Sequence, residues 1–126
     1  MSLARTVRDI LREDRVEGDI LRVLAMGLGS IWFSELVQEV NAFNSSLGTG
    51  RSYSPNEVLK AIRNLERMGI IEVREAIKAV FGEAGGVKDY LVSIKNLTEI
   101  LPVIVTDRKY VRYKLLLREH LKNLTE

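Results

Sequence analysis

One stretch of the sequence sets firm limits on the fold, because it marks both ends of a helix and the strand that follows. Ser54 fits the N-cap position, Pro55 the first helical position and Glu57 the third, which is the spacing of a capping box. Gly69 and the two isoleucines after it mark the change from helical to extended backbone. The sequence therefore predicts a helix over residues 54–69 that leads directly into a strand.

The residues after this helix alternate between apolar and polar side chains, which is typical of a strand with one buried face. A second alternating segment follows the run GEAGG at residues 82–86, where the chain can turn. We therefore expect a β-hairpin over residues 70–95. Its apolar positions are Ile71, Val73, Ile77, Ala79 and Phe81 on the first strand, and Tyr90, Val92 and Ile94 on the second.

Two helices are predicted at the start of the chain. Apolar residues recur at helical spacing from Leu3 to Leu11, which indicates a short amphipathic helix. Asp14 and Glu17 have the spacing of a capping box ahead of an apolar run, so we expect the second helix to begin there. The run GLG at residues 27–29 is its expected end, since glycine adopts the left-handed cap conformation.

A short strand and a third helix are predicted next. The apolar triplet at residues 31–33 indicates a very short strand. Ser34 is the expected N-cap of the helix that follows, and Asn44 is its expected end. The polar run SSLGTGRSY, residues 45–53, contains two glycines and has no periodicity, so we expect a loop there.

The end of the chain holds an apolar segment and a long helix. Residues 97–105 are apolar and interrupted by Pro102, and Thr106 or Asp107 is the expected cap of a closing helix to about Leu124. The apolar face of that helix packs either on the chain's own core or on the same helix of a second copy, and we favour the homodimer. The expected dimer interface consists of Tyr110, Val111, Tyr113, Leu117, Leu121 and Leu124.

Composition narrows the class of protein. The chain has 126 residues, enough for a single domain with one core. It has no cysteine, which excludes disulfides, thiolate zinc sites and cysteine nucleophiles and favours a cytoplasmic location. No apolar run has the length of a signal-peptide core or a membrane span. The formal net charge of +2 permits a nucleic-acid partner without requiring one.

Motifs of catalysis and of cofactor binding are missing from the sequence. The run GTGRS, residues 48–52, is too short for a phosphate-binding glycine loop and lacks its lysine. His120 is the single histidine, which excludes a metal site with two histidine ligands and favours a surface or interface role for this residue. We therefore expect no enzymatic activity, no metal and no cofactor.

The order of the predicted elements resembles that of the winged helix-turn-helix family of DNA-binding proteins. This order, helix, short strand, helix, loop, capped helix and hairpin, covers residues 14–96. Residues 53–75 carry the resemblance most strongly, because LERMGIIEV at residues 65–73 looks like the junction between that family's recognition helix and its first wing strand. The resemblance implies a predominantly helical α+β fold, a winged helix-turn-helix with an extra N-terminal helix and a long C-terminal helix, in a single domain whose C-terminal helical extension covers residues 97–126.

The resemblance also implies sequence-specific binding of double-stranded DNA by a transcriptional regulator. Independently of any family, Asn56, Lys60, Arg63 and Arg67 are spaced four, three and four residues apart, so they lie along one side of the helix. Arginine and asparagine suit base edges, and lysine suits phosphate. The other candidate DNA contacts are Asn64 at the border of this side, Arg51, Ser52 and Tyr53 ahead of the helix, and Lys78 and Lys88 on the wing.

An alternative is a winged helix that contacts protein, as a subunit of a transcription or replication assembly that does not read DNA sequence. The small net charge and the acidic residues Glu83 and Asp89 near the wing tip favour this alternative. A DNA-binding homodimer would instead place two recognition helices about 34 Å apart on a two-fold symmetric site.

Overall fold

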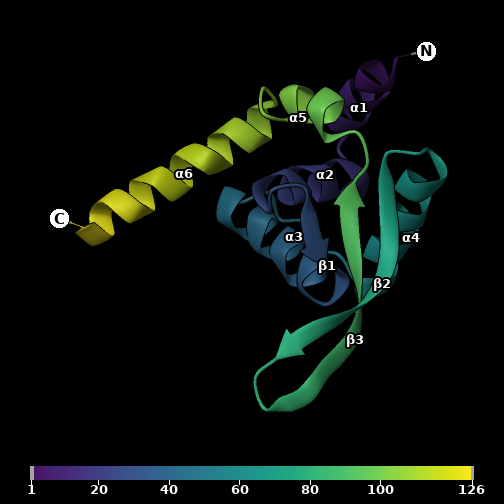
Figure 1. Ribbon diagram of the computed structural model, residues 1–126. Helices are drawn as coiled ribbons and strands as arrows, with labels where there is room; N and C mark the ends of the chain where they lie inside the picture. Colours follow the sequence, from purple (N-terminus) through teal and green to yellow (C-terminus); the bar gives the residue numbers. More distant parts are fainter. Residues whose placement is uncertain (1, 126) are drawn as a thin grey trace.

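The computed structural model describes residues 2–125, which form six helices and one antiparallel sheet (Figure 1). This confirms the predicted α+β class with predominantly helical content. The helices are α1 (Leu3–Arg12), α2 (Val16–Met26), α3 (Phe33–Leu47), α4 (Pro55–Arg67), α5 (Leu97–Ile104) and α6 (Arg108–Thr125). The strands are β1 (Ser30–Trp32), β2 (Ile71–Val80) and β3 (Glu83–Ile94).

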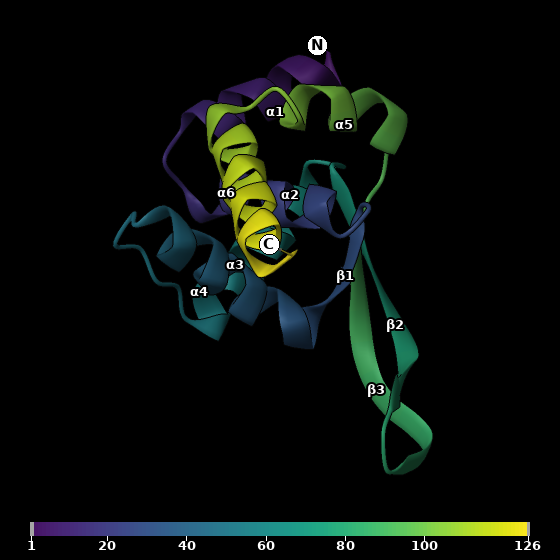
Figure 2. The same cartoon turned by 90° about the vertical axis from the view of Figure 1, so that its left-hand side faces the viewer.

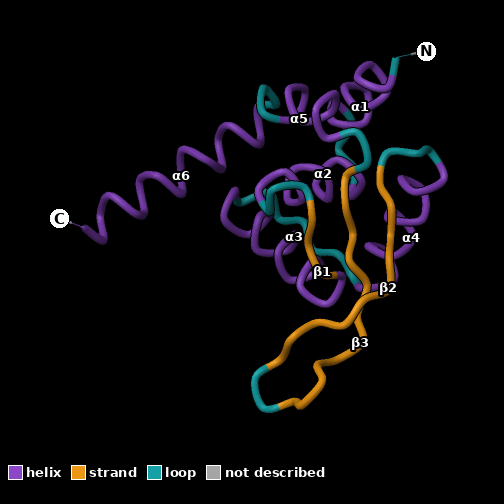
Figure 3. Tube along the Cα trace, viewed as in Figure 1, coloured by secondary structure: helices purple, strands orange, loops and turns teal. Residues whose placement is uncertain are grey.

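Strand β3 lies at the centre of the sheet, between β1 and β2. Val92 of β3 pairs with Ile31 of β1 on one side and with Val73 of β2 on the other, and its side chain is fully buried. Only the base of the hairpin formed by β2 and β3 lies against the helices, and the rest of it projects from the body (Figures 1 and 3). The hairpin therefore has a buried base and an exposed tip.

Helix α2 lies at the centre of the core, in contact with α1, α3, α4 and α5. Apolar side chains lie all round this helix, which is the pattern of a helix surrounded by other elements. Helices α1 and α5 pack against each other, and Ile100 and Ile104 of α5 are fully buried. The fully buried apolar side chains of the central helices include Ile20, Leu21, Leu24, Leu36, Val40, Val58 and Leu65.

The capping box that begins α4 is confirmed. The Ser54 hydroxyl accepts a hydrogen bond from the backbone N–H of Glu57 at 3.2 Å, and the Glu57 carboxylate accepts one from the N–H of Ser54 at 3.2 Å. The helix ends at Arg67, and Gly69 has a φ of +76°, a left-handed conformation that glycine adopts without strain. The two ends of α4 therefore lie where the sequence predicted them, within two residues.

The predicted capping box of Asp14 and Glu17 is wrong. Helix α2 begins at Val16 after Arg15, and no side chain caps its first turn. Asp14 instead forms ion pairs with Arg51 and with Lys109, which are distant in the sequence. Long-range pairing of the carboxylate has therefore replaced the local cap.

The boundaries predicted for α3 are also wrong. The helix begins at Phe33 after Trp32, and Ser34 donates its hydroxyl hydrogen to the carboxylate of Asp89 rather than capping the helix. The helix continues past Asn44 to Leu47, because the Asn44 amide is fully buried and satisfied within the fold. The connection to α4 is correspondingly shorter than the predicted loop.

Two features near the hairpin and the end of the chain differ from the predictions. The turn of the hairpin consists of Phe81 and Gly82, so most of the glycine-rich run belongs to β3. The apolar segment forms α5, and Pro102 lies inside this helix. Asp107 does cap α6, because its carboxylate accepts a hydrogen bond from the N–H of Tyr110 at 3.0 Å.

Candidate nucleic-acid interface

Helix α4 presents the polar side predicted from its sequence to solvent. Its apolar residues Val58, Ala61, Ile62 and Leu65 are buried, and the helix packs on α2. The residues on its outer side are exposed, including all four members of the predicted line. We call these four residues the α4 stripe: Asn56, Lys60, Arg63 and Arg67.

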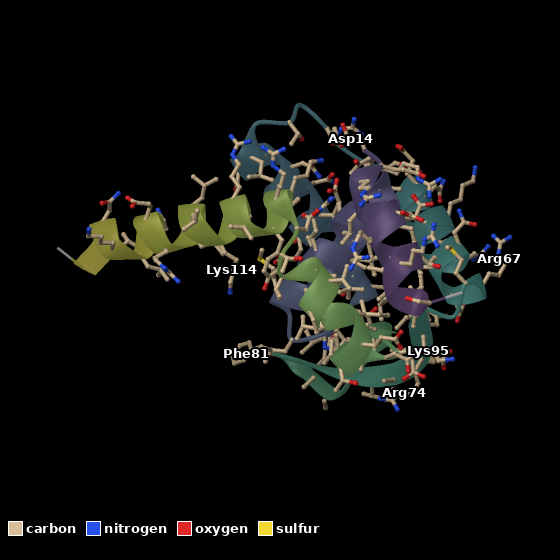
Figure 4. The ribbon with its side chains drawn as sticks, turned by 90° about the horizontal axis from the view of Figure 1, so that it is seen from above. Asp14, Arg67, Arg74, Phe81, Lys95 and Lys114 are labelled. Carbon is tan, nitrogen blue, oxygen red and sulfur yellow. The ribbon has the colours of Figure 1, made fainter. Side chains whose placement is uncertain are left out.

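Two cations of the α4 stripe have no partner within the described residues. Neither Lys60 nor Arg63 forms a hydrogen bond or an ion pair there. Arg67 donates a hydrogen bond to the side-chain oxygen of Asn64 at 3.0 Å, and Asn64 donates to the carboxylate of Glu17 at 3.3 Å. Arg67 lies at the end of α4 and points away from the body (Figure 4). The stripe therefore has free cations at its centre and a hydrogen-bonded end.

The residues just ahead of α4 are held by contacts within the chain. The Arg51 guanidinium donates to the Asp14 carbonyl at 2.6 Å and to the Asp14 carboxylate at 2.5 Å. The Tyr53 hydroxyl donates to Asp19 at 3.1 Å, and burial raises the pKa of this phenol. Ser52 between them is exposed. Arg51 and Tyr53 thus stabilise the entry to α4.

Both lysines predicted on the wing are paired with carboxylates. Lys78 lies 3.1 Å from Glu35 of α3, and Lys88 lies 3.1 Å from Glu75 on the neighbouring strand. Asp89 accepts the Ser34 hydrogen bond beside Lys78. Burial opposes ionisation of Asp89, but hydrogen bonds from Ser34 and the Tyr90 N–H outweigh it and keep the pKa below 3.8. The contacts of Lys78 and Asp89 attach the hairpin to the start of α3, whereas the Lys88 pair lies within the hairpin.

The hairpin tip is apolar. Phe81 is fully exposed at the turn, where Figure 4 shows it at the edge of the molecule, and Ile77 is 62% exposed. The sequence pattern had assigned these residues to the buried face of the hairpin. They are exposed because the strands continue beyond the helices that cover their base. Val80, Val87 and Tyr90 are also exposed on this hairpin.

A cleft of about 480 Å³ separates α4 from the hairpin. Its walls are mainly apolar, but Arg63 lies on one side and two carboxylates, Glu66 and Glu75, lie beside it. The apolar lining consists of Phe33, Leu59, Ile62, Val73 and Tyr90. Arg63 is therefore the cation of this cleft that could contact an anionic ligand.

A buried polar cluster joins α1, α2 and the start of α6. The sequence patterns did not predict it. Arg22 is 2% exposed and donates to Asp107 at 2.6 Å, to Asp19 at 2.7 Å and to the Leu11 carbonyl at 2.7 Å. Asp19 also accepts hydrogen bonds from Asn44 and from Tyr53. The signal was present in the sequence: a carboxylate and a guanidinium three residues apart inside an otherwise apolar run.

Arg74 and Lys95 are two further exposed cations that the sequence analysis did not single out (Figure 4). They lie at the base of the hairpin, on β2 and just after β3. In the part of the chain that the structure describes, no group of acidic and histidine side chains is arranged to hold a metal ion. No helix of this part has the length and apolarity needed to cross a membrane.

Comparison with known proteins gives no match to a family model, to a curated protein or to a solved structure.

Proposed function

We propose that this chain is a winged-helix protein that binds double-stranded DNA through the α4 stripe and acts as a cytoplasmic transcriptional regulator. The order α2, β1, α3, α4, β2, β3 supports the winged-helix assignment, with α4 in the place of the recognition helix and the β2–β3 hairpin in the place of the wing. Helices α1, α5 and α6 are additions to that arrangement.

The main support for this proposal is that Lys60 and Arg63 are exposed and have no partner among residues 2–125. Most other cations predicted to contact DNA are paired with carboxylates, as Arg51, Lys78 and Lys88 are. An exposed helix can enter the major groove, where arginine recognises guanine and lysine contacts phosphate. The centre of α4 is therefore the part of the candidate interface best suited to an anionic duplex.

Pairing of the wing lysines limits what the hairpin contributes. A lysine already bound to a carboxylate must give up that contact before it neutralises a phosphate, so Lys78 and Lys88 are expected to add little to affinity. Arg74, exposed on β2, is the better candidate for a backbone contact from the hairpin. The proposed interface is thus centred on α4.

Titration of a fluorescently labelled pool of random-sequence duplexes with the purified protein tests the proposal. We expect saturable binding that weakens steeply as salt is added. Replacing Lys60 and Arg63 together with alanine is expected to weaken binding at least tenfold, at about 1 kcal/mol or more for each contact. A matched control replaces Arg5 and Arg8, two exposed cations of α1, and removes the same charge. Equal losses in the two double variants would reject α4 as the binding surface.

The cleft between α4 and the hairpin favours a second candidate function, which is docking of a protein segment. Its apolar lining and the carboxylates of Glu66 and Glu75 are better suited to a peptide than to a phosphate backbone. The same titration separates the two functions. Absence of duplex binding even at low salt would favour the protein-binding alternative, a subunit of a transcription or replication assembly.

A further inference from the structure

The distal half of α6 carries leucines that no part of the described chain covers. Near its start the helix packs on α3, where the rings of Tyr113 and Phe43 lie 4.9 Å apart and Tyr110 is only 7% exposed. Beyond this contact the helix leaves the body (Figures 1 and 2). Leu121 is 61% exposed and Leu124 is 68% exposed.

A projecting helix of this length needs a partner surface. Helix α6 has 18 residues, and only its first turns contact the body. Isolated helices shorter than about 12–15 residues are marginally stable in water, and a row of exposed leucines lowers solubility further. The distal half is therefore expected to be stabilised by an apolar surface.

One apolar side runs along the whole of α6. Tyr113, Leu117, Leu121 and Leu124 follow one another at intervals of four, four and three residues, so they share a side of the helix. Leu115 lies on the opposite side, because it is nine residues from Leu124, about two and a half helical turns. One side of α6 therefore packs on the body at Tyr113 and is exposed to solvent at Leu121 and Leu124.

A groove of about 390 Å³ lies beside the base of α6, between α6, α3 and β1. Two carboxylates line it: Glu35, which is paired with Lys78, and Glu39, which has no hydrogen bond or ion pair within the described residues. Burial and then the charge of Glu39 raise the pKa of the Tyr113 phenol, which indicates that this carboxylate faces the groove. The apolar lining includes Val23, Met26, Ile31, Trp32, Phe43 and Leu117.

The charges of the helix and of the groove are opposite in sign. Helix α6 has a single acidic residue, Glu119, among many basic ones. A basic amphipathic helix is complementary to an apolar groove edged by carboxylates, and such complementarity selects a partner and its orientation. The basic residues of α6 are Arg108, Lys109, Arg112, Lys114, Arg118 and Lys122, and of these Arg118 and Lys122 belong to the distal half, on either side of Glu119.

We propose that two copies of this chain associate by each placing the distal half of its α6, residues 116–124, in the groove of the other copy between α3 and the base of α6. A second copy is the occupant that the observations favour, because the uncovered leucines and the groove belong to the same chain, and the distal half of α6 leaves the body beyond the groove. A two-fold arrangement covers both distal helices at once, with the same contact made twice. Tyr110 and Tyr113 remain part of each copy's own core, and the leucines beyond them form the contact between copies.

Sedimentation equilibrium of the intact chain at micromolar concentration, without DNA, tests this arrangement. We expect a dimer for the natural sequence. Leu121→Asp combined with Leu124→Asp is expected to give a folded monomer, since both side chains are exposed within one copy. The control is Leu115→Asp, which places one aspartate on the opposite side of α6, where 54% of the side chain is exposed, and should leave the dimer intact. A monomeric natural chain, or equal effects of the two changes, would overturn the proposal.

Reversing a charge in the groove tests whether α6 of the second copy lies there. Glu39→Lys is expected to raise the dimer dissociation constant several-fold, because it repels the basic helix, whereas Glu99→Lys on the exposed side of α5 should not. A dimer that tolerates Glu39→Lys as well as Glu99→Lys would show that α6 does not lie in this groove. Because no DNA is present, these outcomes are independent of whether α4 binds a duplex.

Discussion

Arg22 and Arg63 carry the same guanidinium group but differ in almost every property of their surroundings. Arg22 is 2% exposed and forms hydrogen bonds with Asp107, Asp19 and a backbone carbonyl, so that it joins α2 to the start of α6. Arg63 is exposed and has no hydrogen-bond or ion-pair partner within the described residues. Arg22 therefore stabilises the fold, whereas the guanidinium of Arg63 can still bind a ligand. Charge alone therefore does not identify a nucleic-acid interface; the contacts of each cation do.

The largest expected effect concerns stability. Arg22→Met removes the cation from two carboxylates, and the 1%-exposed side chain of Asp19 would be left buried without its cation, with only the hydrogen bonds from Asn44 and Tyr53. We expect a loss of about 3–5 kcal/mol in the free energy of unfolding, measured by urea denaturation. The matched change Arg63→Met should cost less than about 0.5 kcal/mol, as surface substitutions usually do. Equal stability of the two variants would contradict the distinction between these arginines.

The next largest effect concerns DNA affinity, where the exposed arginine is expected to matter more than a paired one. Arg63→Ala should weaken duplex binding by about tenfold, in line with loss of one good contact worth about 1–3 kcal/mol. Arg51→Ala should weaken it much less, because the Arg51 guanidinium is bound to Asp14. Fluorescence anisotropy with a common duplex measures both. A larger loss for Arg51→Ala would place the interface at the entry to α4 rather than along it.

A smaller effect concerns the helix that carries Arg63. Ser54→Ala removes the side-chain half of the capping box and is expected to lower the free energy of unfolding by about 1 kcal/mol. Ser52→Ala, two residues earlier and outside the box, should have no measurable effect. The comparison requires thermal or urea denaturation of both variants. Equal stability would mean that other contacts of α4 fix its first turn.

The smallest effect is a change in acid stability. The hydrogen bond from Lys109 lowers the pKa of Asp14 below 3.8, burial opposes this, and the charges of Lys109 and Arg51 add to the lowering. A carboxyl group with a lowered pKa in the folded state contributes stability above its unfolded pKa and loses it as the pH falls through the folded pKa. Asp14→Asn should therefore lose less stability than the natural chain as the pH falls below about 4. Asp9→Asn, a control near Arg12 on the surface of α1, should retain the natural pH response.

The sequence predicted α4 and the extent of the hairpin well, though not its turn or its exposed tip, because the signals for these two elements are local. The reciprocal hydrogen bonds of Ser54 and Glu57 lie within one helical turn, and Gly69 follows directly at the other end. The exposed stripe followed from the helical periodicity, and the α+β class followed from the resemblance in the order of the predicted elements. No long-range information was needed for these features.

The predictions that were wrong involve polar residues whose partners are distant in the sequence. Asp14 resembled a cap but bonds Arg51, which is 37 residues away, and Ser34 resembled a cap but bonds Asp89, which is 55 residues away. Lys78 and Lys88 were predicted as further DNA contacts on a wing of mixed charge, and the structure shows that both are paired with carboxylates. A one-dimensional pattern records which residues can form hydrogen bonds, but tertiary contacts decide which ones are formed.

The dependence of duplex affinity on salt, compared between the natural chain and the Lys60→Ala, Arg63→Ala double variant, shows whether α4 is the DNA-binding surface. Each phosphate neutralised by a cation contributes about −0.9 to the slope of log affinity against log salt concentration. The slope of the double variant should be shallower by about 0.9 if Lys60 contacts a phosphate and Arg63 a base edge, and by about 1.8 if both contact phosphates. The Arg5→Ala, Arg8→Ala control should keep the natural slope. An unchanged slope and affinity in the α4 variant would contradict the assignment of this helix as the DNA-binding surface.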